Sequence, residues 1–225
     1  MTFPLSAMNF VAVRGRLTRT FAVFLSISAL LAGCALPDKP ARPVMYDFGP
    51  GAQSAAAATR QAPLATLALA EIEASGPLDS SAVLYRLAYA DAQQLRPYAQ
   101  ARWSMPPPQL LRQRLRESLG QRRVVLNIDE LASLGRSEGV HPLTLRIELE
   151  EFSQIFESPE RSAGLVRLRA TLVDSLPTGD RLLAQRSVVA QRPAPTPDAP
   201  GGVRALTAAA DAAVEEITQW LQQVR

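Results

Sequence analysis

The feature that most constrains the fold is a strict alternation of apolar and polar side chains in the C-terminal half of the sequence. In residues 143–150, leucine or isoleucine occupies every odd position, and threonine, arginine or glutamate occupies every even one. Residues 166–172 repeat the pattern, and a turn-forming sequence at 177–180 precedes a third extended segment at 182–190. A period of two is typical of a strand with one buried face, so we predict that the last two segments pair as an antiparallel hairpin.

Shorter segments elsewhere also have the composition of strands. They are residues 44–48, 64–73, 83–87, 94–100 and 124–128. Pro97 predicts an edge position for the fourth of these, because proline cannot donate a hydrogen bond to a neighbouring strand, and the fifth is short and apolar enough to be buried. Residues 52–62 and 129–142 have no regular pattern and are predicted to be loops.

Two segments have the apolar spacing of helices. The first follows the prolines at 106–108, and Gly120 is expected to end it. Its apolar face consists of Leu110, Leu111, Leu115 and Leu119. Prolines and glycines at 193–202 are expected to end all regular structure before the second helix, at 203–224. Strands punctuated by two helices predict an α+β fold with a single domain, in which both helices pack on an antiparallel sheet.

The N-terminus has the order of features of a secretory signal. Three arginines, at positions 14, 16 and 19, precede an apolar run at 21–31. That run is too short for a helix that crosses a bilayer, which needs about 20 residues. Initiation at Met1 or at Met8 leaves this arrangement intact. The sequence Leu-Ala-Gly-Cys at 31–34 resembles the lipobox of bacterial lipoproteins, so we predict a signal peptide at 1–33 and lipidation of Cys34.

The residues after Cys34 predict where this anchor lies. In well-studied lipoproteins an aspartate directly after the cysteine favours retention at the inner membrane, whereas Ala35 and Leu36 follow it here. We therefore expect acyl chains such as palmitate on Cys34 to hold the protein in the inner leaflet of the outer membrane, facing the periplasm. Residues 34–43 are rich in proline and are predicted to be a tether, and residues 44–225 are predicted to be the folded domain.

The excess positive charge belongs to the N-terminal segment. The net charge is +3, and the three arginines before residue 33 account for it, so the rest of the chain is neutral. A neutral domain does not have the basic surface that nucleic-acid binding requires. With one cysteine and one histidine, the sequence excludes an intramolecular disulfide and a multi-histidine metal site, and we expect no cofactor.

The sequence contains no recognisable catalytic motif. We find no phosphate-binding loop, dinucleotide-binding glycine signature, nucleophile elbow or zinc-protease motif. His141 precedes a proline in a polar segment, and Glu148 and Glu150 lie on the polar face of a predicted strand. Solvation explains these side chains better than catalysis does, so we predict that the protein is not an enzyme.

Two groups of side chains are candidates for a partner interface. Trp103 precedes the first helix and Trp220 lies on the last, and each fits either a core position or an interface contact. The second group is a cluster of arginines, Arg112, Arg114, Arg116, Arg122 and Arg123. Such a cluster is typical of a solvated helix flank, and also of a site for lipid phosphate or an acidic partner. Core packing for the tryptophans and solvation for the arginines are the simpler interpretations.

The order of several segments behind Cys34 resembles the ABC-type transport auxiliary lipoprotein family. The segments are residues 46–50, 83–86, 98–103, 106–111, 149–156, 172–174 and a final helix that ends in Trp220-Leu221. This family supplies the lipoprotein component of paraquat-inducible and related intermembrane lipid transport systems. The resemblance brings no catalytic residues with it, and Cys34 is the one position to which it assigns a chemistry.

The resemblance implies partners as well. Members are thought to work beside an ABC ATPase, a permease and a membrane-anchored Mce-domain protein that conducts phospholipid. We therefore predict an outer-membrane-anchored, non-catalytic auxiliary subunit of such a system. The alternative is a lipoprotein that assists the assembly of an outer-membrane β-barrel or plugs it. A homo-oligomeric ring is a further expectation, because a conduit end must be open and one domain of this size has no obvious room for a channel.

Overall fold

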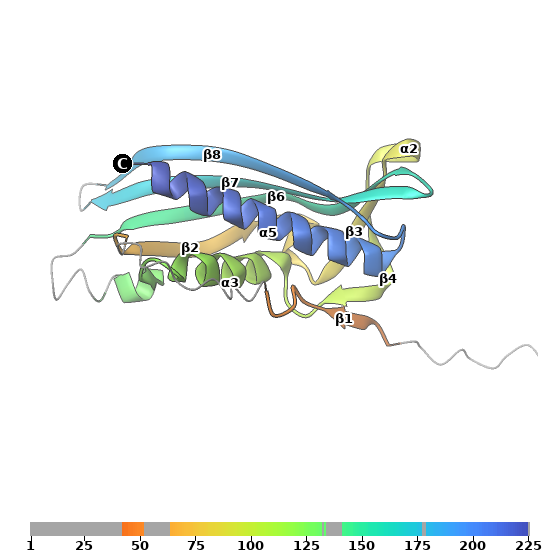
Figure 1. Ribbon diagram of the computed structural model, residues 1–225, viewed down its shortest axis with the longest axis horizontal. Coiled ribbons are helices and arrows are strands. Elements are labelled where there is room, and N and C mark those ends of the chain that lie inside the picture. The colour runs from red at the N-terminus through yellow and green to blue at the C-terminus, as the bar shows by residue number, and fades with distance from the viewer. Residues whose placement is uncertain (1–41, 52–63, 132, 134–140, 177–178, 225) are drawn as a thin grey trace, which may run out of the picture. The chain divides into compact units, whose positions relative to one another are not determined.

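The computed structural model describes residues 42–51, 64–131, 133, 141–176 and 179–224, and within these residues eight strands form one sheet (Figure 1). The strands are β1 Val44–Tyr46, β2 Leu67–Ala74, β3 Ala82–Leu87, β4 Ala92–Trp103, β5 Val125–Leu126, β6 Leu143–Ser158, β7 Arg161–Leu176 and β8 Gly179–Pro193. The helices with assigned bounds are α2 Ala88–Asp91, α3 Pro107–Gly120 and α5 Ala199–Gln223, and Gly76–Asp79 forms a turn of 3₁₀-helix.

The α+β class is confirmed, but the sheet is mixed, whereas an antiparallel one was expected. Strands β6, β7 and β8 are antiparallel neighbours, which includes the predicted hairpin, and β3 and β4 are antiparallel too. In contrast, β2 and β3 run parallel to β6, β1 runs parallel to β4, and β5 runs parallel to β2. Alternation shows which face of a strand is buried but not its direction. Long connections, such as the one that contains α3, permit parallel neighbours.

A bulge in β6 keeps the apolar side chains of this long strand on one face. The pairing with β7 shifts between Leu149 and Glu151, so that Glu150 is an extra residue. Phe152 therefore shares the inner face with Leu149 although three positions separate them, and both side chains are buried. Alternation without the bulge would have placed Phe152 on the polar face.

The helices α3 and α5 lie side by side on one face of the sheet (Figure 1) and join it in a single core. The four leucines predicted for the apolar face of α3 are all buried. Arg114 forms an ion pair with Asp211, and Arg122, just beyond α3, donates a hydrogen bond to Gln222. The helices therefore run in the same direction, and their C-terminal ends meet at one end of the sheet.

Helix α5 begins at Ala199, earlier than the predicted start at residue 203. The side chain of Asp198 caps it by accepting a hydrogen bond from the Gly201 N–H at 2.8 Å. Hydrogen bonds from Thr196 and from Gly201 lower the pKa of this carboxyl group. Pro200 was expected to exclude a helix, and this is wrong because proline is tolerated in a first turn, where its missing N–H has no helical partner.

Three of the shorter predicted segments differ in detail from the structure. Within 124–128, β5 contains two residues, and Val124 and Ile128 are 60% and 43% exposed, so the expected buried strand is wrong. Residues 129–131 are helical where a loop was expected, and Ile128, predicted as the end of the strand, belongs to the same helical stretch. Strand β4 is longer than predicted, and β1 pairs with it at Ala101 to Trp103. Pro97 therefore lies on a stretch of β4 that β1 does not cover, in agreement with an edge position. The predicted loop at 52–62 lies outside the described residues.

Gly164 on β7 lets α5 approach the sheet at backbone contact. A Cβ atom at this position would lie 2.5 Å from the carbonyl carbon of Ala205 and 2.5 Å from the nitrogen of Leu206. We expect Gly164→Ala to lower the free energy of unfolding by roughly 1–3 kcal/mol, because the helix must move away from β7 to make room. Denaturant unfolding followed by circular dichroism measures this loss.

Gly120→Ala is the matched control for that variant. Gly120 is the last residue of α3, a Cβ there would meet no other atom within 4 Å, and its φ is not positive. The left-handed conformation expected of a glycine that ends a helix is therefore absent, and alanine improves helix propensity at this site. Stability should be unchanged or slightly higher, and an equal loss in both variants would contradict the importance of the close approach at Gly164.

Candidate functional site

Arg112 and Arg116 are held against their own domain. Each guanidinium donates a hydrogen bond to the side-chain oxygen of Asn127, at 2.8 Å and 2.6 Å. Arg112 also donates to the carbonyl oxygen of Ala70 at 3.3 Å and forms an ion pair with Glu71 at 3.2 Å. The two arginines thus join α3 to β2 and to the segment after β5, which gives them a structural role, and their role in binding a partner stays a prediction.

Arg114 is almost completely buried between α5 and the chain after β1. It donates to the carbonyl oxygens of Phe48 at 2.5 Å and Gly49 at 3.2 Å, and it forms an ion pair with Asp211 at 3.3 Å. Burial raises the pKa of Asp211, an effect that the positive charge of Arg114 opposes. This arginine therefore fastens the segment after β1 to the two helices.

Both tryptophans belong to the core, so the candidate interface role of Trp103 and Trp220 is corrected. Trp103 has no exposed surface, and its ring packs edge-to-face against Phe48 and Phe152, with centroid distances of 5.6 Å and 5.7 Å. Trp220 is 8% exposed and contributes to the buried face of α5. Side chains so deeply packed present almost no surface to a partner.

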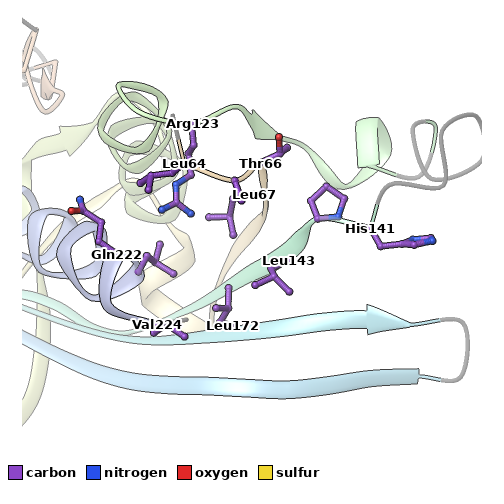
Figure 2. Close-up of a pocket in the computed structure, with 12 residues that line it drawn as sticks. Leu64, Thr66, Leu67, Arg123, His141, Leu143, Leu172, Gln222 and Val224 are labelled. Carbon is purple, nitrogen blue, oxygen red and sulfur yellow. The ribbon is translucent and has the colours of Figure 1, made fainter. Parts of the chain in front are cut away.

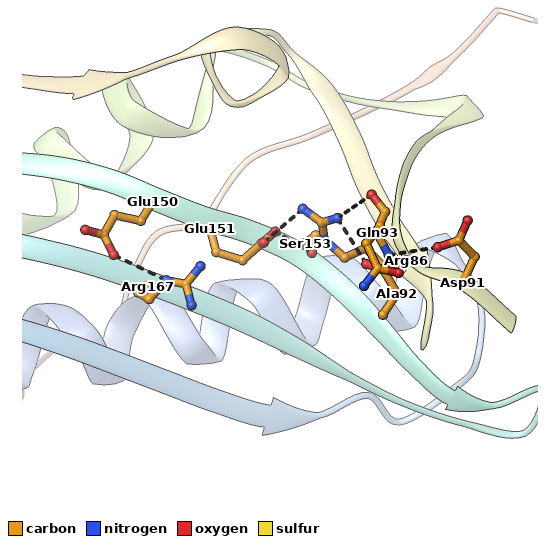
Figure 3. Close-up of polar contacts among 8 residues, drawn as sticks. All are labelled: Arg86, Asp91, Ala92, Gln93, Glu150, Glu151, Ser153 and Arg167. Atoms are coloured by element: carbon orange, nitrogen blue, oxygen red, sulfur yellow. Dashed lines mark hydrogen bonds and ion pairs between the residues drawn. The ribbon is translucent and has the colours of Figure 1, made fainter. Parts of the chain in front are cut away.

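A largely buried ion pair lies where the hairpin of β3, α2 and β4 meets β6 (Figure 3). Arg86 donates to one carboxylate oxygen of Glu151 at 3.0 Å and to the carbonyl oxygens of Ala92 and Gln93. The Ser153 hydroxyl donates to the other carboxylate oxygen at 2.7 Å. This network satisfies the Glu151 carboxylate and fixes the hairpin to the sheet.

The neighbouring acids on β6 pair with arginines of β7. Glu150 contacts Arg167 at 3.3 Å, as Figure 3 shows, and it also pairs with Arg169. Glu148 contacts Arg169 at 3.7 Å. These are cross-strand pairs on the polar face of the sheet. The Glu148 side chain is exposed, as interpreted from the sequence, whereas the Glu150 side chain is only 20% exposed.

A cavity lies at the end of the sheet where α3 and α5 finish (Figure 2). Its volume is about 450 Å³, within the range of roughly 300–1,000 Å³ that is typical of ligand sites. Leu67, Leu172 and Leu221 line it, and all three belong to the hydrophobic core, so the cavity reaches down to that core. The half-buried Leu143 and Val224 also contribute apolar surface.

Arg123 supplies the positive charge of this cavity. In Figure 2 its guanidinium is directed toward the space beside Leu64 and Leu67. Among the residues that the structure describes, this guanidinium has no hydrogen-bond or ion-pair partner. Burial and the neighbouring charge of Arg122 lower the pKa of Arg123, yet an arginine stays protonated at neutral pH. Among the described residues, the twelve that line the cavity include no aspartate or glutamate.

The other candidates from the sequence contribute little to this site. His141 lies beside the cavity, but Figure 2 shows its ring directed away from the apolar lining. Cys34 lies outside the described residues, so its lipidation stays a prediction. Within the described ranges we find no group of three or more potential metal ligands, and no helix there is long and apolar enough to span a bilayer.

Comparison with known proteins identifies the family. Residues 46–218 match the family described as the ABC-type transport auxiliary lipoprotein component. The chain belongs to this family. The chain is thus a member of a family of auxiliary components associated with ABC-type transport in the cell envelope, and the resemblance stated from the sequence is confirmed. No curated protein matches the sequence.

Solved structures show the same fold at low sequence identity. A crystal structure of a Xanthomonas campestris protein of the DUF330 family is 18% identical, with a TM-score of 0.60, and the match covers 82% of the present chain and 94% of that chain. A crystal structure of an uncharacterized protein is 14% identical, with a TM-score of 0.56, and the match covers 80% of the present chain and 99% of that chain. At these identities the likeness shows the fold alone.

The cavity is the feature that sequence reasoning missed. Arg123 appears in the sequence as one member of an arginine cluster, yet the structure separates it from Arg112, Arg114 and Arg116, which have partners in the domain. One signal was present: Arg123 follows Gly120 beyond the predicted helix, so it does not share the spacing of the helical arginines. The apolar lining comes from segments far apart in the chain and has no local signature.

Proposed function

We propose that this protein is the outer-membrane lipoprotein of an Mce-type intermembrane lipid transport system, in which it acts as a non-catalytic auxiliary subunit. The observation that carries the proposal is the family match over residues 46–218 behind the lipobox-like sequence at 31–34. The partners in this proposal are an Mce-domain protein with its permease and ATPase, and phospholipid. Further copies of the chain, forming a ring, complete the proposed assembly.

The arrangement of the domain supports this role. Figure 1 shows β1, the first strand after the proposed tether, at one end of the domain, and the C-terminus of α5 at the opposite end. The cavity lies at the α5 end, because Leu221 and Val224 line it. The folded domain thus offers a cavity with apolar lining at the end opposite to β1, and a site of this kind suits a protein that meets lipid.

Affinity purification of the full-length protein from solubilised envelopes tests the partners. We expect mass spectrometry to find an Mce-domain protein together with phospholipid, and less of both when Cys34→Ser removes the anchor. Recovery of an outer-membrane β-barrel without any Mce-domain protein would contradict the transport role and favour a role in barrel assembly. Recovery of neither class of partner would also contradict the proposal.

Cys34→Ser is expected to remove the protein from its membrane. Serine has no thiol for the lipid-modifying enzyme, and a short apolar signal segment without acyl chains does not anchor a protein stably. In density-gradient fractions of the envelope, the native protein should sediment with outer-membrane markers, whereas Cys34→Ser should not. A variant that still sediments with the outer membrane after a high-pH wash would contradict anchoring through Cys34.

A further inference from the structure

We propose that the cavity at the C-terminal ends of α3 and α5 binds one acyl chain of an anionic amphiphile, with the negatively charged headgroup held by Arg123. This inference deepens the proposed function and rests on it only for the source of the lipid. Two properties of the cavity indicate this class of ligand. Leucines form much of its lining, and Arg123 gives the described lining a positive charge.

The lining accounts for the acyl chain. Leucines from β2, β6, β7 and α5 surround the space, and several of them are part of the core, so an apolar chain would continue the packing of the domain. Removal of apolar surface from water is the main favourable contribution to binding of this kind. A ligand without an apolar part would gain no comparable contribution from these leucines.

Arg123 accounts for the charge of the headgroup. Its guanidinium is partly withdrawn from water, has no acidic partner among the described residues, and is directed toward the cavity in Figure 2. A guanidinium forms paired hydrogen bonds with carboxylate or phosphate oxygens, and such charge-assisted bonds are stronger than neutral ones. A headgroup beside Arg123 would replace the hydration that this side chain has lost.

The two helix ends beside the cavity also contribute to its electrostatic potential. The N–H groups of Arg122 and Arg123 donate to the carbonyl oxygen of Leu119, at 3.2 Å each, and the N–H of Val224 donates to that of Trp220 at 3.2 Å. These bonds engage one carbonyl oxygen at each helix end, and the positive charge of Arg123 opposes the negative potential of the others. The side chain of Arg123 is left as the charged group of the lining.

Titration calorimetry with three lauroyl probes below their micellar concentrations tests the site. The probes are laurate, lauroyl-lysophosphatidylglycerol and the uncharged 1-lauroylglycerol. The protein is the chain from residue 34 onward with Cys34→Ser, so that its own acyl groups do not compete. We expect at least one anionic probe to bind about tenfold more tightly than 1-lauroylglycerol, the factor that one charge-assisted hydrogen bond supplies. Preference for laurate or for the lysophospholipid identifies a carboxylate or a phosphodiester as the natural headgroup.

Two variants separate the headgroup from the acyl chain. Arg123→Gln should weaken the anionic probes about tenfold and leave 1-lauroylglycerol unchanged, because one charge-assisted interaction is lost. Val224→Trp should weaken all three probes, because the larger side chain fills apolar space. Arg192→Gln is the control, since Arg192 is exposed and bonds the carbonyl oxygen of its neighbour Gln191.

Equal affinity for the charged and uncharged probes, or no effect of Arg123→Gln on the anionic ones, would overturn the assignment of the headgroup. No binding of any probe by the folded protein would overturn the site as a whole. Failure of the site is distinguishable from failure of the transport role. Loss of probe binding with an Mce-domain protein still recovered rejects the cavity alone, whereas probe binding without an Mce-domain protein rejects the transport role alone.

Discussion

Replacing Trp103 by alanine is expected to lower the free energy of unfolding by about 3–5 kcal/mol, the range for removal of a large aromatic side chain from a core. Trp103 is completely buried, and its ring packs edge-to-face against both Phe48 and Phe152. Those two rings are stacked with a centroid distance of 6.0 Å. Removal of the indole would therefore leave a space that three elements share, since Phe48 follows β1 and Phe152 lies on β6. Such a loss is a large fraction of the 5–15 kcal/mol that is typical of a folded domain.

Trp103→Phe keeps the prediction testable if the alanine variant does not fold. Phenylalanine retains an edge-to-face aromatic contact, and it removes the indole N–H, which has no hydrogen-bond partner in the structure described. We expect a loss of less than about 1.5 kcal/mol, as for conservative apolar replacements in a core. Urea unfolding of both variants measures the difference, and a loss below about 1 kcal/mol in Trp103→Ala would show that Trp103 is not a core residue.

Replacing Arg86 by methionine is expected to lower the free energy of unfolding by roughly 2–3 kcal/mol, because the Glu151 carboxylate is left without its cation. Glu151 is 7% exposed, and its side chain lies 3.0 Å from the Arg86 guanidinium. The Arg86 side chain is 21% exposed, so solvent reduces the loss below the range for a fully buried pair. The same change removes the bonds from Arg86 to the carbonyl oxygens of Ala92 and Gln93, so the hairpin should loosen at this point.

A double-mutant cycle with Arg86→Met and Glu151→Met isolates the ion pair. The double variant should be more stable than Arg86→Met, because no unpaired carboxylate remains in a buried site. Arg192→Met serves as the matched control for an exposed arginine, and its stability should stay within about 0.5 kcal/mol of the native value. Additive losses in the cycle would contradict an interaction between the two side chains. Hydrogen exchange of the β3–β4 amides would show whether the hairpin loosens as expected.

Local patterns in the sequence predicted the elements that have one buried face. The alternation at 143–150 and 166–172 identified β6 and β7, and the leucine spacing after residue 106 identified α3 with its buried side correctly. These signals are local, because the period of a strand or a helix determines which side chains share a face. The order of segments behind Cys34 was enough for the family, although no single segment was specific.

Contacts between distant segments had no such signal. The parallel pairing of β2 and β3 with β6 depends on how long connections cross the sheet, and the close approach at Gly164 depends on where α5 passes over β7. Helix α5 starts early because the Asp198 side chain caps its first turn, and the prolines before the helix do not prevent this. In each case the sequence allows several arrangements, and the packing of the whole domain selects one.

The sequence by itself determined the lipobox-like N-terminus, the α+β class, the apolar faces of the main strands and helices, and the family. The tertiary structure alone decided the roles of the arginines: Arg112 and Arg114 have partners from other segments, whereas Arg123 meets a cavity lined by leucines that are distant in the chain. The physical reason is that periodicity records the environment of one element at a time. A binding site arises where several elements end together, and only the folded chain brings those ends into contact.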